Sequence, residues 1–183
     1  EQYKNFYFSP ELDFTQEDLN TNSAASNNLK KQDGSYSDFY FNYNLLYDNR
    51  DSSFNPTRGS VFSFSQDLPL ISSDDEISNT FSYTKYKSLN DSKSMIGKIS
   101  FYLNTVNSLG NNDARISKRA HVPYSRLRGF ERGKVGPIDG NDYIGGNFVS
   151  SLNISSTIPQ ILENSQSTEF VIFLDMANIW GVD

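Results

Sequence analysis

The strongest constraint on the fold is a two-residue alternation of apolar and polar side chains that recurs along most of the chain. Successive residues of a β-strand point to opposite faces, so the alternation predicts strands with one apolar and one polar face. It is clear where Phe6, Phe8 and Phe14 share one parity, and it is weakest in 79–89. We expect about seven strands, in the segments 5–15, 38–48, 60–66, 79–89, 94–104, 147–155 and 169–180.

The connections between these segments alternate between long polar loops and short turns. The segments 17–35 and 107–146 are long, whereas 48–60, 90–93 and 159–166 are fairly short. An up-and-down meander with its long loops on one side produces this order, and transmembrane β-barrels are built in this way. A soluble β-sandwich or lipocalin-like barrel shows the same alternation, so alternation alone leaves both classes open.

Two further features favour the membrane barrel over the soluble sheet. The predicted strands are long, and Tyr36, Tyr47 and Trp180 lie near strand ends, where aromatic girdles would be. No run approaches the 18 or so apolar residues of a transmembrane helix, and the N-terminus is not a signal peptide. The chain does not begin with Met, so we expect a processed chain or a fragment of a longer one.

Composition excludes several classes of function. The chain has no Cys, which rules out disulfides and thiolate metal sites. Its net charge of -6 argues against nucleic-acid binding, which depends on neutralising phosphates. The one His, His121, lacks a nucleophile motif nearby, and the calcium-like DGND at 139–142 has Ser150 where the loop needs Glu. We therefore expect no enzyme, no metal site and no cofactor.

Four motifs carry a resemblance to a known family. The LRGF motif, formed by Leu127, Arg128, Gly129 and Phe130, resembles the V/L-R-G-F/Y signature of the bacterial surface antigen, or outer-membrane assembly-factor, superfamily. FLDMANIW at 173–180 is similar to the family's F-x-D-x-G strand. RDSSFNPTRGS at 50–60 resembles its D-x-x-F-x-P-T-x-G turn, through Asp51, Phe54, Pro56, Thr57 and Gly59. GPIDGNDYIGGN at 136–147 is similar to the segment that follows the signature in the insertase branch, through Gly136, Asp139, Gly145, Gly146 and Asn147.

The resemblance implies an all-β fold, an antiparallel transmembrane barrel of sixteen strands that follows periplasmic POTRA domains. Residues 1–183 would form a partial barrel domain, about strands seven to thirteen, with no POTRA domain. The short turns would be periplasmic, and the loop at about 107–146 would be an extracellular loop that folds back into the lumen. Seven strands cannot close, and open sheet edges are not tolerated in lipid, so we expect a partial chain.

The resemblance also assigns roles to residues of the loop. The family's motif Arg pairs with a strand Asp, which implies a contact between Arg128 and Asp175, and strand parity turns both Asp175 and Asn153 inward. Gly129 would allow a tight backbone approach, and Phe130 would pack the loop tip against the inner wall. The sequence departs from the family where Asn153 replaces a second acidic partner and Ala177 replaces a Gly. A competing hypothesis is a surface patch for lipopolysaccharide phosphates, formed by Arg115, Lys118 and Arg119.

The function implied is the barrel of an insertase that assists folding and insertion of β-barrel proteins in the Gram-negative outer membrane. The partners implied are the outer-membrane bilayer and lipopolysaccharide, nascent outer-membrane proteins and, through POTRA domains, the lipoproteins of an assembly complex, with no nucleic acid. The alternatives are a sister transporter, such as a TamA-like factor or a two-partner secretion pore, and a soluble ligand-binding β-sandwich or barrel. The IGGN segment at 144–147 favours the insertase branch.

Overall fold

The computed structural model describes residues 4–110, 113–159 and 169–182. Seven long strands form one sheet in the order β1-β2-β3-β4-β5-β8-β9, and a short hairpin, β6-β7, lies outside it. The long strands are β1 (Phe6–Leu19), β2 (Gly34–Asp48), β3 (Gly59–Ile71), β4 (Glu76–Ser88), β5 (Ile96–Ser108), β8 (Phe148–Ile158) and β9 (Phe170–Trp180). The remaining elements are α1 (Asn27–Lys30), η1 (Ile116–Lys118), η2 (Tyr124–Arg126), β6 (Ile138–Asp139) and β7 (Asp142–Tyr143).

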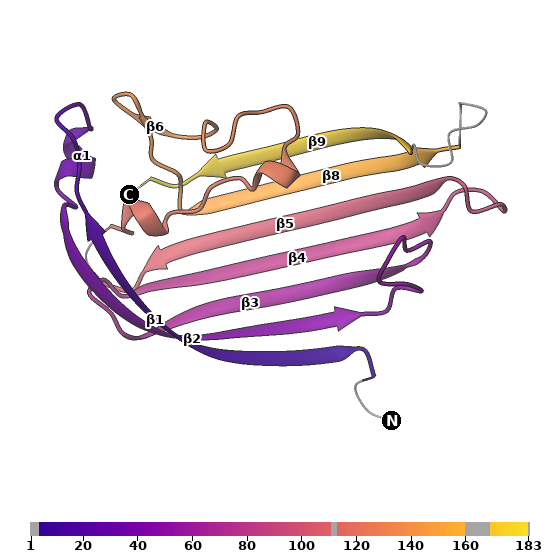
Figure 1. The fold of residues 1–183 in the computed structure, drawn as a ribbon, viewed down its shortest axis with the longest axis horizontal. Coiled ribbons are helices and arrows are strands. Elements are labelled where there is room, and N and C mark those ends of the chain that lie inside the picture. Colours follow the sequence, from indigo (N-terminus) through magenta and orange to yellow (C-terminus); the bar gives the residue numbers. More distant parts are fainter. Residues whose placement is uncertain (1–3, 111–112, 160–168, 183) are drawn as a thin grey trace.

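Each long strand pairs antiparallel with its neighbour, and the strands lie side by side in chain order (Figure 1). The predicted all-β antiparallel meander of about seven strands is therefore confirmed. Several strands run beyond the predicted segments, since β3 continues to Ile71 and β5 to Ser108. Backbone pairing can continue where side-chain alternation fades, because the ladder satisfies N–H and C=O groups whatever the side chain. The expected turn at 159–166 falls almost wholly outside the described residues.

The two faces of the sheet differ in chemistry, and we call the face that carries Asp38, Ser100 and Asn153 the inner face. It is lined by small polar side chains that bond across strands, as Thr84 does with Ser100 at 2.8 Å. The outer face carries a row of aromatic rings, and Phe81 lies 5.2 Å from Phe62 and 5.8 Å from Phe101 between ring centroids. Many outer-face apolar side chains remain exposed, among them Phe8, Leu12, Ile172 and Leu174. An exposed apolar face of this size suits a lipid environment.

The buried apolar core lies between the sheet and the segment that connects β5 to β8. Val106, Val149 and Ile179 contribute from the strands. The connecting segment contributes Ala114, Ala120, Val122 and Leu127. This connection therefore packs as part of the folded core, with burial of a Val, Leu or Ile side chain worth about 1.5–3 kcal/mol.

The turn between β2 and β3 is organised by one carboxylate, that of Asp51. Its Oδ1 accepts from the backbone N of Thr57 at 2.9 Å and of Arg58 at 3.2 Å, and its Oδ2 accepts from the Thr57 hydroxyl. Gly59 has a φ of 99°, as the turn motif predicts. These contacts hold the pKa of Asp51 at about 2, chiefly through the Thr57 hydroxyl. Phe54 at the turn tip is largely exposed.

None of the helices in the described residues is long and apolar enough to cross a bilayer.

Candidate functional site: the β5–β8 loop

Residues 109–147, which we call the β5–β8 loop, run over the inner face of the sheet before the chain enters β8. The loop carries η1, η2 and the β6-β7 hairpin, and η2 contacts both β8 and β9. Figure 1 shows the loop crossing above β8 and β9 rather than extending away from the sheet. Side chains of the loop are therefore placed against the polar inner face.

Arg128 meets Asp175 of β9 through a bidentate ion pair. Its Nε donates to Asp175 Oδ2 and its Nη2 to Oδ1, both at 2.7 Å, and its backbone N donates to Oδ2 at 3.1 Å. The guanidinium also lies over the ring of Phe173, with Cζ 3.6 Å from the ring centroid. The hydrogen bond to Asp175 raises the pKa of Arg128 above its ordinary value. Phe173 and Asp175, both in the FLD segment of β9, thus form the binding site of the Arg128 side chain, which we call the Arg128 seat.

Asn153 of β8 completes the Arg128 seat as a donor. Its Nδ2 donates to Asp175 Oδ1 at 2.9 Å and to the backbone O of Arg126 at 2.6 Å. The amide therefore orients the carboxylate and ties it to the loop backbone, a role that an acidic residue could not perform. Among the residues described, Asp175 is the one carboxylate that forms an ion pair with Arg128.

Two roles expected for the motif are not fulfilled by contacts with the described part of the wall. A Cβ added to Gly129 would meet nothing within 4 Å, so the glycine does not serve a tight approach. Its φ of 87° explains the residue type instead, because side chains disfavour that conformation. Phe130 does not pack the loop tip against the described wall, since it is 62% exposed. The turn at Gly129 carries it off the sheet, and Leu127, which is buried, makes the apolar contact in its place.

The segment 136–147 is fixed against the end of β9. A Cβ on Gly136 would lie 2.4 Å from Ile179 Cγ2, and one on Gly146 would lie 2.7 Å from the backbone O of Trp180. Gly145 is also buried, and Asn147 donates its backbone N–H to the Gly181 O at 2.7 Å. Asp139 pairs with Asp142 in the β6-β7 hairpin, so DGND forms a turn. No group of three potential metal-ligating residues occurs in the described parts of the chain.

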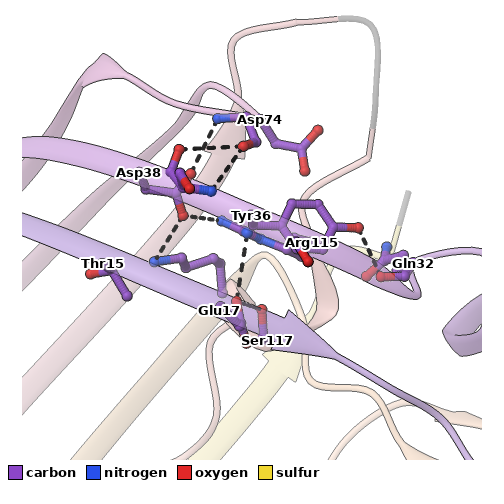
Figure 2. Close-up of polar contacts among 12 residues, drawn as sticks. Thr15, Glu17, Gln32, Tyr36, Asp38, Asp74, Arg115 and Ser117 are labelled. Atoms are coloured by element: carbon purple, nitrogen blue, oxygen red, sulfur yellow. Dashed lines mark hydrogen bonds and ion pairs between the residues drawn. The ribbon is translucent and has the colours of Figure 1, made fainter.

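A second charged contact holds the beginning of the loop, and the sequence did not predict it. We call it the Arg115 cluster, which comprises Arg115, Asp38, Glu76, Glu17 and Lys118. Arg115 Nη2 donates to Asp38 Oδ2 and lies 3.7 Å from Glu76 Oε2, while its Nη1 lies 3.5 Å from Glu17 Oε2. Figure 2 shows Glu17 of β1 and Asp38 of β2 reaching Arg115, and Glu76 contributes from β4.

The centre of the Arg115 cluster is almost fully enclosed, while Glu17 and Lys118 at its margin are partly exposed. The side chains of Arg115 and Asp38 are 1% and 0% exposed. The Tyr36 ring centroid lies 4.2 Å from Arg115 Cζ, and the backbone N of Arg115 donates to Glu76 Oε1 at 2.9 Å. Burial alone would lower the pKa of Arg115, but the Asp38 hydrogen bond and the nearby carboxylates raise it. The loop thus begins with a permanently charged guanidinium among three carboxylates.

The cluster overturns two expectations. Arg115 cannot belong to a surface patch for lipopolysaccharide phosphates because it is buried, and Arg119, 7% exposed, donates its Nε to the Ala114 O at 3.2 Å. Lys118 stays partly exposed but lies 3.6 Å from Asp38. Tyr36 stacks on Arg115 from the inner face, so it is not part of an outer aromatic girdle. One signal was present in the sequence, since Glu17, Asp38 and Glu76 all lie where a strand meets a long loop or a turn.

Arg126 adds a third contact that sequence reasoning missed. Its Nη1 donates to Ser100 Oγ on β5 at 2.6 Å, and its guanidinium lies over the Tyr102 ring at 5.1 Å. Each of the three Arg residues thus binds a different part of the inner face. This arrangement can fix a long loop in place, and it brings together no nucleophile and base within the described residues.

Comparisons with known proteins agree with this geometry. The family model described as "Omp85 superfamily domain" matches residues 1–183. Among solved structures, the chain resembles the crystal structure of BamA from Haemophilus ducreyi lacking POTRA domains 1-3, with a TM-score of 0.85 and 20% identity. The match covers 97% of this chain and 39% of that one, and no curated protein matched. The fold is that of a section of the BamA barrel, which confirms the partial transmembrane barrel, and the chain belongs to the Omp85 superfamily.

Proposed function

We propose that this chain forms the wall and the inward-folded loop of a BamA-like insertase, which assists the folding and insertion of β-barrel proteins in the Gram-negative outer membrane. The observation that carries the proposal is the bidentate contact between Arg128 and Asp175, supported by Asn153 and Phe173. It joins the two family motifs LRGF and F-x-D across the lumen side of the sheet. In this role no bond is made or broken, and nascent strands would add to the barrel by edge pairing.

The proposal places the short turns at the periplasmic side and the β5–β8 loop at the extracellular side of the lumen. The loop would brace the wall from within, because it contributes most of the buried apolar core. A sister transporter of the superfamily is the second candidate. The fixed IGGN segment, whose four residues are all buried, favours the insertase.

The test compares Arg128→Ala with Lys134→Ala in the intact protein. Lys134 lies in the same loop but pairs only with exposed Glu131, so it is a matched control. We expect Arg128→Ala to reduce insertion of a client barrel into lipid vesicles several-fold and to lower the temperature at which the barrel unfolds on a heat-modifiability gel. Wild-type behaviour of both variants would rule the proposal out. Passage of a soluble passenger across the membrane, with no client insertion, would favour the transporter.

A further inference from the structure

The outer face of the sheet carries a groove of about 560 Å³ at the end opposite the β5–β8 loop. It crosses β4, β5, β8 and β9, and nothing in the insertase proposal uses it. Its apolar lining includes Leu89, Ile99, Ile154, Ile172 and Leu174, with Gly97 beneath Leu89 and Phe173 at the β9 side.

Gly97 lets a neighbouring side chain pack close to the strand and lower one side of the groove. Gly97 of β5 pairs with Lys87 on one side and with Ser156 on the other, so the outer row has a gap at this position. A Cβ added there would lie 3.1 to 3.3 Å from three atoms of the Leu89 side chain, so Leu89 covers Gly97 and the groove runs beside it. Ile99, Ile154, Ile172 and Leu174 border the groove, and each is more than 40% exposed. The groove is therefore an open apolar channel along the face that we assign to lipid.

One border of the groove is positively charged. Lys85 and Lys87 occupy alternate positions of β4, point to the outer face and are exposed. Neither forms an ion pair with any described residue, and no Asp or Glu lines the groove. An apolar channel with two free ammonium groups at its margin is complementary to an amphiphile that has an anionic head group.

We propose that this groove binds an anionic glycerophospholipid, with one acyl chain beside Leu89 along Ile99 and Ile154 and the phosphate between Lys85 and Lys87. The choice of leaflet rests on the proposed function, which puts this end of the sheet at the periplasmic side, where the inner leaflet supplies phospholipid. Lys ammonium groups at a membrane surface attract anionic lipid by Coulomb interaction, and each adds to the affinity.

The experiment measures lipid retention by the intact protein in detergent, using native mass spectrometry with phosphatidylglycerol and, for comparison, phosphatidylcholine. The double variant Lys85→Gln/Lys87→Gln should bind phosphatidylglycerol about 30-fold more weakly, because each charge contributes roughly a five-fold effect. Lys93→Gln is the matched control, since Lys93 lies in the β4–β5 turn at the same end but outside the groove. Gly97→Val tests the channel itself and should also weaken retention, because the added side chain would push Leu89 into the groove.

Equal retention of the two lipids, or retention unchanged in the double variant, would overturn the proposal. A loss of phosphatidylglycerol retention in Lys93→Gln as large as in the double variant would also overturn the proposal, because it would show that a Lys outside the groove contributes equally. Wild-type retention in Gly97→Val would overturn the acyl-chain site. Insertion of a client barrel should be assayed on the same preparations. The lipid groove is tested by lipid retention in these variants and the insertase function by insertion in Arg128→Ala, so one proposal can fail without the other.

Discussion

Arg115 and Arg128 both hold the β5–β8 loop through a carboxylate, but their surroundings differ. The Arg128 side chain is 39% exposed although its partner Asp175 is only 3% exposed, so solvent screens this ion pair from one side, whereas Arg115 and Asp38 are both enclosed. Removing one partner of a buried pair leaves an uncompensated charge, which costs more than losing an exposed pair. The residue that resembles the family signature is therefore not the one on which stability should depend most.

We expect Arg115→Ala to lower the free energy of unfolding by about 3–5 kcal/mol, because Asp38 and Glu76 stay buried without their cation. Arg128→Ala should cost only about 1–2 kcal/mol, since its pair is strong but partly hydrated. Urea unfolding of the protein in detergent, followed by Trp fluorescence, would measure both. A loss for Arg115→Ala no greater than that for Arg128→Ala would contradict the structure.

The carboxylate of Asp51 makes the β2–β3 turn sensitive to acid. Its folded pKa of about 2 lies below the ordinary value of 3.8, so it stabilises the turn at pH values above about 4. That contribution is lost as the pH falls from about 4 through 2. We expect the amide resonances of Thr57 and Arg58 to titrate with a midpoint near pH 2, and to lose this transition in Asp51→Asn. A midpoint near pH 4 would show that the carboxylate does not accept these hydrogen bonds.

At the scale of elements, β2 to β5 share a chain of polar side chains on the outer face, among its apolar residues. Tyr43 OH donates to Gln66 Oε1 at 2.9 Å, Gln66 Nε2 to Asn79 Oδ1 at 2.6 Å, and Asn79 Nδ2 to Thr105 Oγ1 at 3.3 Å. Polar groups facing hydrocarbon are costly when unpaired, so the four residues satisfy one another across three strand interfaces.

This ladder predicts coupling between Gln66 and Asn79. Asn79→Leu should destabilise the barrel by about 1–3 kcal/mol, because it leaves the Gln66 amide and the Thr105 hydroxyl without their partner. Gln66→Leu should destabilise the Asn79→Leu variant much less than it destabilises the wild-type protein. A double-mutant cycle in a lipid-like detergent should therefore give a coupling energy of about 1 kcal/mol. Leu12→Ala on β1 is the control and should add independently to Asn79→Leu. Full additivity of the Gln66 and Asn79 changes would show that the ladder does not form in lipid.

The strands were predictable because each carries its own period of two, and Phe6, Phe8 and Phe14 define a face without reference to any partner. The contact of Arg128 with Asp175 was reached through a family resemblance, with parity supplying the inward direction of Asp175. The Arg115 cluster was not predicted because Glu17, Asp38, Glu76 and Arg115 come from four segments whose closeness depends on sheet order and register. The direction in which Phe130 leaves this part of the sheet follows the positive φ at Gly129, which the residue type permits but does not require.

At the scale of the whole molecule, the sheet and the loop act as one packed unit. The apolar side chains of the outer face are exposed to the surroundings and do not form the buried core. That core therefore includes residues of the loop, which are Ala114, Ala120, Val122 and Leu127. Three Arg residues, Arg115, Arg126 and Arg128, then bind this loop to β2, β5 and β9. A loop that supplies both the core and the charged contacts would keep one wall of an insertase rigid while other parts of the barrel move.

The most direct test of this account is a charge exchange at the Arg128 seat, measured by insertion of a client barrel into lipid vesicles. Arg128→Asp and Asp175→Arg should each reduce insertion strongly, because each places two like charges in contact. The double variant restores opposite charges across the same contact, and we expect it to recover a substantial part of wild-type insertion. A double variant no more active than the weaker single variant would contradict the account.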